Sequence, residues 1–306
     1  MELKKEYKKF VENYLPFEWE IDKSERYHGQ HSFEISFKRF FYVFKFLKKL
    51  QTANPNPKII DVGSYPGNMI KLCQHIFRTY PKYLSVGLDL DDHFVSEVKN
   101  YNVECLDTEI DPNFPASKET KEWNVDNFDV CLLLDTIEHL VNPTFCLDKI
   151  NKSLKVGGHI LLTTDNISNF LYVIKMILKG ESPNVNFILS SMFYIGNHRP
   201  HHREFSKKEL EFLLKHSGFE IIEHEYFDRK QGEFFIENKK LRKRKDLRLK
   251  SILVNSIKNL ANFIPHFRNH QIILAKKIEN IQDVKRMEPT QSKNKWIQYR
   301  LKNLGY

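Results

Sequence analysis

Cysteine is scarce in this chain and occurs only as isolated residues. The 306 residues include four cysteines, with no CxxC pair among them: Cys73, Cys105, Cys131 and Cys146. A disulfide framework or a structural zinc site needs closely or regularly spaced cysteines. The spacing therefore argues against both and favours a reducing, cytoplasmic setting.

Long apolar runs are also missing. The longest one lies near residues 170–178 and is interrupted by Lys175, whereas a bilayer-spanning helix needs about 20 apolar residues. Residues 1–6 are charged and lack the apolar core of a signal peptide. We therefore expect neither a transmembrane helix nor a secretory leader. A cytoplasmic protein, at most peripheral at a membrane surface, is the prediction.

Glycine is the third scarce residue type, with 11 in the chain. A nicotinamide dinucleotide fold needs three glycines in the pattern G-x-G-x-x-G. Residues 63–68 read GSYPGN, so that Tyr65 and Asn68 stand where this pattern needs glycine. No Gly-Lys-Ser/Thr follows, which also disfavours a phosphate-binding P-loop.

What the chain does contain is a regular alternation of strands and helices. Alternation of this kind is typical of a mostly parallel sheet with helices on both faces. Such a sheet binds ligands at the carboxyl ends of its strands. The apolar runs predict strands at 58–62, 84–88, 103–106, 128–134, 158–163, 219–227 and 271–276, and helical spacing predicts helices at 67–80, 92–99, 143–154, 169–179 and 206–218.

The same patterns divide the chain into three segments. A helical extension or lid is expected at 1–54, where a Pro- and Asn-rich cluster ends it. The α/β domain is expected at 55–280, with an insertion at about 228–268 before the last strand. Residues 281–306 form a polar tail.

Acidic residues and glycines follow several of the predicted strands. Strand one reads IIDVGSYPG at 59–67, strand two ends in VGLD at 86–89, and strand three ends in CLD at 105–107. Strand four continues as FDVCLLLDTIEHLVNP at 128–143, followed by LKVGGHILL at 154–162 and HREFS at 202–206. In this order the motifs resemble class I S-adenosylmethionine-dependent methyltransferases, above all those acting on small molecules and glycans. The resemblance runs from about 58 to 277.

This resemblance implies a Rossmann-like, seven-stranded, mostly parallel sheet with S-adenosyl-L-methionine as cofactor. The loop at 61–67 would hold the methionine end of the cofactor. The two carboxylate oxygens of Asp89 would face the two ribose hydroxyls, and Asp107 would meet the adenine amino group. The expected cofactor contacts are Asp61, Gly63, Ser64, Tyr65, Gly67, Asp89, Leu90, Asp107 and Asp135.

Histidines near the strand ends are candidates for catalysis. A hydroxyl acceptor loses its proton as it attacks the methyl group, and a neutral imidazole is suited to take that proton. His139 follows the fourth strand, with Asp135 as its orienter, and His202 or its neighbour His201 comes from a later segment. The alternative for His139 is a residue that packs or caps at the start of a helix.

The same residues suggest a second chemistry. Asp135, Glu138 and His139 with His201 or His202 resemble the metal site of small-RNA 2′-O-methyltransferases, and their oxygen and imidazole ligands suit Mg²⁺ or Mn²⁺. The first position is Asp where that family has Glu, and a Glu-His pair is common in metal-free relatives. A metal-free site is therefore the favoured prediction.

A cluster of positive charge lies late in the chain. Residues 239–250 contain eight basic residues and one acid, Asp246, and so carry most of the net charge of +9. They open a predicted amphipathic helix at roughly 240–263. Such a helix could lie on an anionic membrane surface, contact nucleic acid or pack on the sheet edge, and packing is slightly favoured. The sequence does not indicate an oligomeric state.

Three functions are therefore open from the sequence. The first is O-methylation of a sugar in a glycan, or of another small-molecule or lipid-linked acceptor. The second is a metal-assisted RNA 2′-O-methyltransferase. The third is a non-catalytic protein that retains the cofactor fold to bind a partner.

Overall fold

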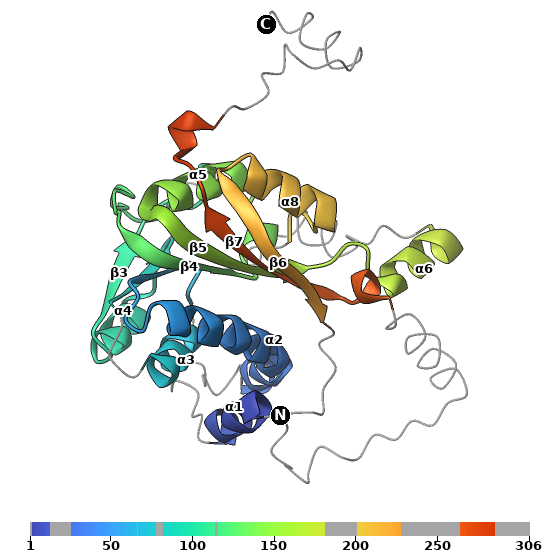
Figure 1. Ribbon diagram of the computed structural model, residues 1–306, viewed down its shortest axis with the longest axis horizontal. Coiled ribbons are helices and arrows are strands. Elements are labelled where there is room, and N and C mark those ends of the chain that lie inside the picture. The colour runs from blue at the N-terminus through green and yellow to red at the C-terminus, as the bar shows by residue number, and fades with distance from the viewer. Residues whose placement is uncertain are drawn as a thin grey trace, which may run out of the picture.

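The structure, a computed structural model, describes residues 2–12, 26–65, 67–77, 82–113, 116–180, 201–227 and 264–284. Within these residues the chain forms one seven-stranded sheet with helices against both faces (Figure 1). The strand order is β3-β2-β1-β4-β5-β7-β6. The strands are β1 (Ile59–Val62), β2 (Tyr83–Gly87), β3 (Val103–Asp107), β4 (Phe128–Leu134), β5 (Leu154–Asp165), β6 (Phe219–Phe227) and β7 (His270–Lys277).

Helices connect the strands and extend the fold at its amino end. The α-helices are α1 (Glu2–Glu12), α2 (Arg26–Ala53), α3 (Asn68–Ile76), α4 (Asp92–Lys99), α5 (Pro143–Ser153), α6 (Phe170–Lys179) and α8 (Lys207–Lys215), and the 3₁₀ turns are η2 (Ile137–His139), η3 (Pro265–Phe267) and η4 (Ile281–Asp283). None of the helices in this described part of the chain is both long and apolar enough to cross a bilayer. The predicted insertion helix and most of the polar tail lie outside the described residues.

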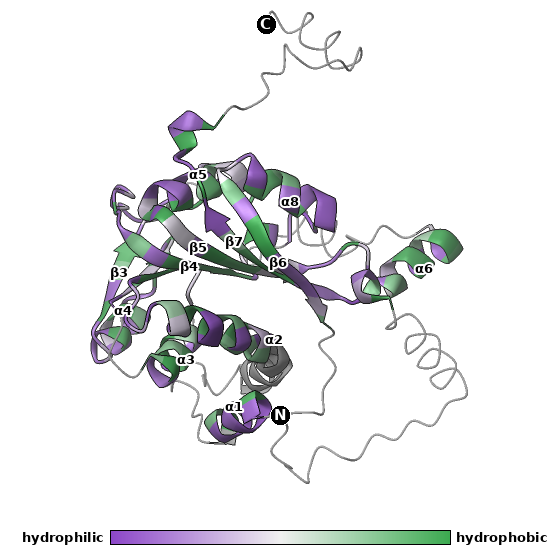
Figure 2. Ribbon diagram, viewed as in Figure 1, coloured by the Kyte–Doolittle hydropathy of each residue, from purple (hydrophilic) through white to green (hydrophobic). Residues whose placement is uncertain are grey.

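The alternation of side chains along each strand sorts the core into two layers. Because successive residues of a strand point to opposite faces, Ile59 belongs to one apolar cluster and Ile60 to the other. The first cluster joins the sheet to α1, α2, α3 and α4. The second joins it to α5 and α8. The prediction of helices on both faces is therefore confirmed. In Figure 2 hydrophobic residues line much of the sheet, whereas the edge strand β6 also carries hydrophilic ones.

The sheet is mostly parallel, as predicted, with β7 as the exception. β3, β2, β1, β4 and β5 pair in parallel, and β7 runs antiparallel to both β5 and β6. Strand β5 begins at Leu154, four residues before the predicted start at 158. Leu154 pairs with Phe128 ahead of a register shift, and Gly157 then bends the strand with a φ of +88°. A pattern of apolar residues does not reveal such an irregular pairing.

The amino-terminal helices are packed into the first core layer. Tyr7 and Phe44 are fully buried there, and their rings lie 5.4 Å apart. Tyr42 of α2 stacks on Phe227 at the end of β6, with ring centroids 4.6 Å apart. Lys45 of α2 adds an ion pair of 2.5 Å to Glu225. The helical prediction for this region is therefore confirmed in the described ranges, and α2 lies directly against the sheet.

A buried carboxyl group lies in the central strand β1. Asp61 is 2% exposed, and Tyr83 of β2 donates a hydrogen bond to its Oδ2. Burial raises the pKa of Asp61 to about 7, while the Tyr83 hydrogen bond and the positive charge of Arg39 oppose the rise. An unfolded aspartate titrates near 4. Between about pH 4 and pH 7 the unfolded chain loses this proton and the folded chain keeps it, so stability falls as pH rises through that window.

We therefore expect Asp61→Asn to be more stable than the wild type, because its amide oxygen still accepts from Tyr83 and no charge has to be buried. The gain in unfolding free energy should grow from pH 4 to pH 7 and reach up to about 4 kcal/mol. Urea denaturation at pH 4.5, 6 and 8 measures it. Asp92→Asn is the control, because the Asp92 side chain is 99% exposed. A gain that is constant with pH would contradict the assignment.

Candidate functional site

The carboxyl ends of the parallel strands bring the predicted acidic residues to one edge of the sheet. Asp107 ends β3, Asp89 follows β2, and Asp135 follows β4. The backbone N–H of Asp89 donates to Asp107 Oδ1 at 2.8 Å, which couples the first two. The predicted acidic residues therefore do lie at one edge of the sheet, and the Asp107 carboxylate binds the backbone of Asp89 there.

Local backbone geometry holds Asp89 in place. Its φ of +54° is in the left-handed region, which Asp adopts more readily than most residues. The amides of Ser117 and Lys118 donate to its carboxylate at 3.1–3.2 Å. Leu90 is buried directly against Gly87, where an added Cβ would overlap its side chain. The Asp89 carboxylate is thus fixed in direction before any ligand binds.

The glycine loop between β1 and α3 is tightly packed at its start. Gly63 has a φ of +76°, and a Cβ there would lie 2.8 Å from Thr136 Cγ2 and closer still to its Oγ1. Ser64 is buried and hydrogen-bonds Ser85 of β2. Tyr65 is 57% exposed and meets the ring of Phe94 edge-on. Glycine is therefore required at position 63, whereas Tyr65 projects from the loop.

The rest of the loop leads into α3, with Gly67 as the residue that caps the amino end of this helix. Gly67 is left-handed, with a φ of +88°, and its N–H donates to the Ser64 carbonyl at 2.6 Å. Pro66 lies outside the described residues. The Asp61 carboxyl, in contrast to these residues, is turned into the sheet toward Tyr83. Asp61 is therefore a buried residue of β1 that supports the loop from within the sheet.

Asp135 joins the strand edge to the amino-terminal helices. It has a left-handed φ of +46°, and its N–H donates to the Thr163 carbonyl of β5 at 2.9 Å. Thr163 Oγ1 donates to Asp135 Oδ1 at 2.7 Å, and Arg39 of α2 pairs with Oδ2. The sequence did not indicate Arg39, because a lone arginine in an amphipathic helix has no motif.

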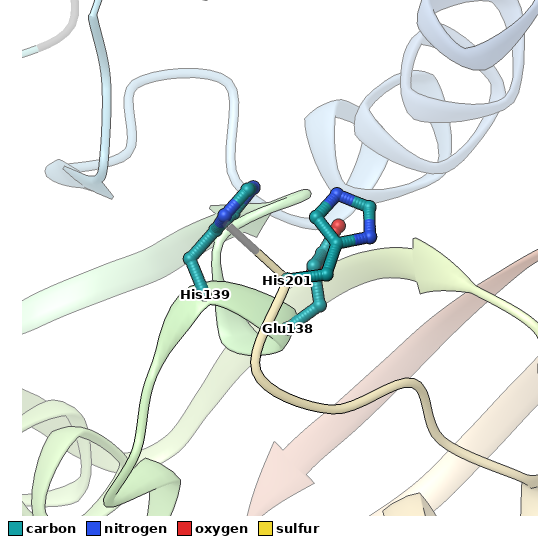
Figure 3. A group of neighbouring side chains, drawn as sticks. All are labelled: Glu138, His139 and His201. Atoms are coloured by element: carbon teal, nitrogen blue, oxygen red, sulfur yellow. The ribbon is translucent and has the colours of Figure 1, made fainter. Parts of the chain in front are cut away.

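Three potential ligand groups meet just beyond Asp135. Glu138 and His139 lie on η2, and His201 reaches them from the segment before α8 (Figure 3). One nitrogen or oxygen of each lies within 4.8 Å of the others. The imidazole rings of His139 and His201 meet edge to face, with centroids 4.6 Å apart. Neither Asp135 nor His202 belongs to this convergent group.

Glu138 is the buried member of the group. It is 1% exposed, and its Oε2 accepts from Thr164 Oγ1 at 2.8 Å. Burial raises its pKa to about 8, and the charges of Asp135 and Asp165 add to the rise. Its backbone carbonyl accepts from the N–H of His202 at 2.7 Å. This main-chain bond places His202 and, one residue earlier, His201 beside η2.

His201 also belongs to a second group, which the sequence did not indicate. Its Nδ1 lies 3.6 Å from Asp165 Oδ2 and 3.9 Å from Glu204 Oε1. His270 Nε2 lies 2.8 Å from Asp165 Oδ1. Burial lowers the pKa of His201, but the hydrogen bond with Glu204 and the charges of Glu138 and Asp165 outweigh it and raise the pKa overall. Asp165 ends β5, so the rule that strand ends carry chemistry could have identified it.

The arrangement has a defined chemical capacity. Imidazoles beside buried carboxylates can accept and hold a proton, and the same oxygen and nitrogen atoms can bind a divalent cation. Asp135 stands between this histidine cluster and the glycine loop. The basic run at 239–250 and most of the donor-rich stretch at 197–203, through Pro200, lie outside the described residues.

Comparisons with known proteins agree with this geometry. Residues 37–224 match the family model described as a methyltransferase domain. The ubiquinone biosynthesis O-methyltransferase, mitochondrial, of Dictyostelium discoideum is 31% identical over 115 residues. That match covers 36% of this chain and 33% of the relative, so the chain matches about a third of the relative's length.

Solved structures with a similar fold are more distant in sequence. An S-adenosylmethionine-dependent methyltransferase from Archaeoglobus fulgidus is 15% identical, with 76% of this chain and 94% of that chain covered and a TM-score of 0.43. A 1,6-didemethyltoxoflavin-N1-methyltransferase from Burkholderia thailandensis, with bound S-adenosylhomocysteine, is 12% identical, with 77% and 78% covered and a TM-score of 0.43. The family match, which spans more than half of the chain, is the decisive comparison: the chain belongs to the methyltransferase-domain family and is an S-adenosylmethionine-dependent methyltransferase.

Proposed function

We propose that this enzyme methylates a hydroxyl oxygen of a small acceptor, such as a sugar in a glycan, another small molecule or a lipid-linked compound. The observation that carries the proposal is the contact between His139 and His201 at the end of β4, backed by the buried Glu138. A hydroxyl nucleophile needs a base, and this imidazole pair is placed where parallel-sheet enzymes bind ligands. The Dictyostelium relative, by its name, is also an O-methyltransferase.

The residues of the sheet edge fit the cofactor, which supplies an activated methyl group when bound. The Asp89 carboxylate, oriented by two backbone amides, suits two neighbouring ribose hydroxyls. The side chains of Leu90 and Asp107 border it and would meet the adenine. The close packing of Gly63 against Thr136 holds the loop near the ends of the strands. Ser64, Tyr65 and Gly67 would then line the methionine end of the cofactor. Asp135 would lie between the cofactor and the acceptor.

Within this site we assign proton removal to His139. His201 is engaged by the carboxylates of Asp165 and Glu204, which favour its charged form. His139 contacts His201 edge to face and is half-buried, so it is the imidazole positioned to accept a proton from the acceptor. His202 contributes its backbone N–H to Glu138 and is assigned a supporting role. Asp135 orients the site through Thr163 and Arg39.

The proposal predicts that His139→Ala lowers kcat at least 100-fold, in line with loss of a general base, and leaves the affinity for S-adenosylmethionine unchanged. The acceptor is first found by transfer of a tritiated methyl group to fractions of a cell extract. His216→Ala is the matched control, because His216 contacts Phe212 on α8 and lies outside the site. Wild-type turnover in His139→Ala would remove His139 as the base.

The second candidate is a metal-assisted RNA 2′-O-methyltransferase. The convergence of Glu138, His139 and His201 favours it, because these atoms form an oxygen-and-imidazole set suited to Mg²⁺ or Mn²⁺. The basic run at 239–250 would then contact the phosphate backbone.

Chelation separates the two candidates. If a metal assists the reaction, full removal with EDTA should abolish methyl transfer, and added Mn²⁺ or Mg²⁺ should restore it. RNA binding should also weaken steeply as salt rises. Unchanged turnover after complete chelation would eliminate the metal-assisted candidate and leave the imidazole mechanism.

The cysteine pattern supports a cytoplasmic location as part of the proposal. All four cysteines are free thiols in the structure, and Cys73, Cys131 and Cys146 are buried. Burial raises the pKa of these three thiols and keeps them in the unreactive protonated form.

A further inference from the structure

Helix α6 is apolar, yet none of its described side chains is buried. It follows β5 and stands away from the sheet and its covering helices (Figure 1), and it is coloured as mainly hydrophobic in Figure 2. Met176, Ile177 and Leu178 are 51%, 71% and 77% exposed. The helix therefore presents a contiguous apolar surface to its surroundings.

Such a helix requires a partner. An isolated helix of ten residues is not stable in water on its own. Helices in folded proteins gain their stability by burying an apolar stripe. Exposed apolar patches of this kind mark surfaces that bind a protein, a ligand or a membrane.

The charges on α6 point to one kind of partner. Its sequence, FLYVIKMILK, contains no acidic residue. Lys175 and Lys179 are both exposed beside the apolar side chains. Large apolar residues combined with lysine are typical of helices that lie in the interface of an anionic bilayer.

The start of α6 is firmly tied to the point where the basic segment rejoins the fold. Asn166 Nδ2 donates to the carbonyls of His266 and Arg268, both at 2.8 Å. The rings of Phe170 and Phe267 lie 5.6 Å apart. These contacts hold α6 against η3, which directly follows the segment 228–263.

The same edge receives the other end of that segment. Phe227, the last residue of β6, is paired with His270, the first residue of β7. The sequence between them includes residues 239–250, with eight basic residues and one acid. Asp165, His270 and Phe227 thus lie in register on neighbouring strands, so a strongly cationic stretch leaves and rejoins the fold at the sheet edge from which α6 starts. Its positive charge adds to that of the α6 lysines and favours an anionic surface.

We propose that α6 is a membrane-docking helix, which lies in the headgroup region of an anionic phospholipid bilayer. Because Asp165 ends β5 only a few residues before α6, the docked bilayer lies close to the His201 and Glu204 cluster. This deepens the proposed function and rests on it for the acceptor class, which becomes an apolar or lipid-linked hydroxyl compound that enters from the membrane.

The test measures binding of the full chain to vesicles of phosphatidylcholine mixed with anionic phosphatidylglycerol, which supply a negative surface potential. The expected result is sedimentation with these vesicles, weaker sedimentation at high salt, and at least tenfold weaker binding to pure phosphatidylcholine. The double variant Ile177→Glu with Leu178→Glu should raise the vesicle Kd at least tenfold. Val156→Glu is the control, because Val156 is also exposed, at 58%, but lies at the opposite end of β5.

Several outcomes would overturn the proposal. They are the absence of wild-type binding, equal binding of the double variant, or equal binding to neutral vesicles. Self-association of the wild type that the double variant loses would identify a second copy as the occupant. Strong hydrogen-exchange protection of α6 without vesicles would show that the chain covers α6 itself. Methyl transfer to the labelled extract fraction without vesicles, measured on every variant, reports the proposed function separately.

Discussion

The site depends on the contacts of Asp135, which join the end of β4 to β5 and to helix α2. Its carboxylate binds Thr163 of β5 with one oxygen and Arg39 of α2 with the other, while its backbone has a left-handed φ at the end of β4. The side chains of Arg39 and Asp135 are only 16% and 13% exposed. Removing one partner of such a buried pair leaves an uncompensated charge, which typically costs about 3–5 kcal/mol. The pair therefore locks the amino-terminal helices to the strand edge.

Two different environments lie on either side of this junction. Toward β1, β2 and β3 are the glycine loop, Asp89 and Asp107, which offer a fixed carboxylate and a close backbone approach. Toward β5 and β7 are His139, His201 and the carboxylates around them. A cofactor on the first side and an acceptor on the second would meet at Asp135. The proposed membrane helix α6 continues from the second side, so that cofactor and acceptor would approach from different directions.

The sequence predicts the sheet well because strand burial leaves a strong local pattern. The apolar run of β4 and the alternation in β6 indicate strands without any tertiary information. The positions of Gly63, Asp89 and Asp107 also follow, since a parallel sheet places its strand ends at one edge. The contacts that these residues make cannot be predicted from the sequence. Asp61 faces Tyr83, and Asp89 accepts from the amides of residues 117 and 118, because of packing between segments distant in sequence.

The histidine cluster shows the same limit. His201 and His202 are adjacent and chemically identical, so no local pattern tells which one faces His139. The choice is made by the main-chain bond from the His202 N–H to Glu138, together with the carboxylates of Asp165 and Glu204. Arg39 is fixed by the packing of α2 on the sheet. The exposure of α6 cannot be predicted from the sequence either, because the spacing of apolar residues is the same in a buried and in a membrane-bound helix.

Cofactor binding at the carboxyl edge of the sheet is the property on which the site's assignment depends most directly. Calorimetric titration with S-adenosylmethionine tests it, with Asp89→Asn compared against the neighbouring exposed Asp92→Asn. Asn tolerates the left-handed backbone of residue 89, so the change removes the charge with little strain. We expect one saturable site in the wild type and Asp92→Asn, and affinity at least tenfold weaker in Asp89→Asn. Wild-type affinity in Asp89→Asn, or no binding by the wild type at millimolar ligand, would contradict it.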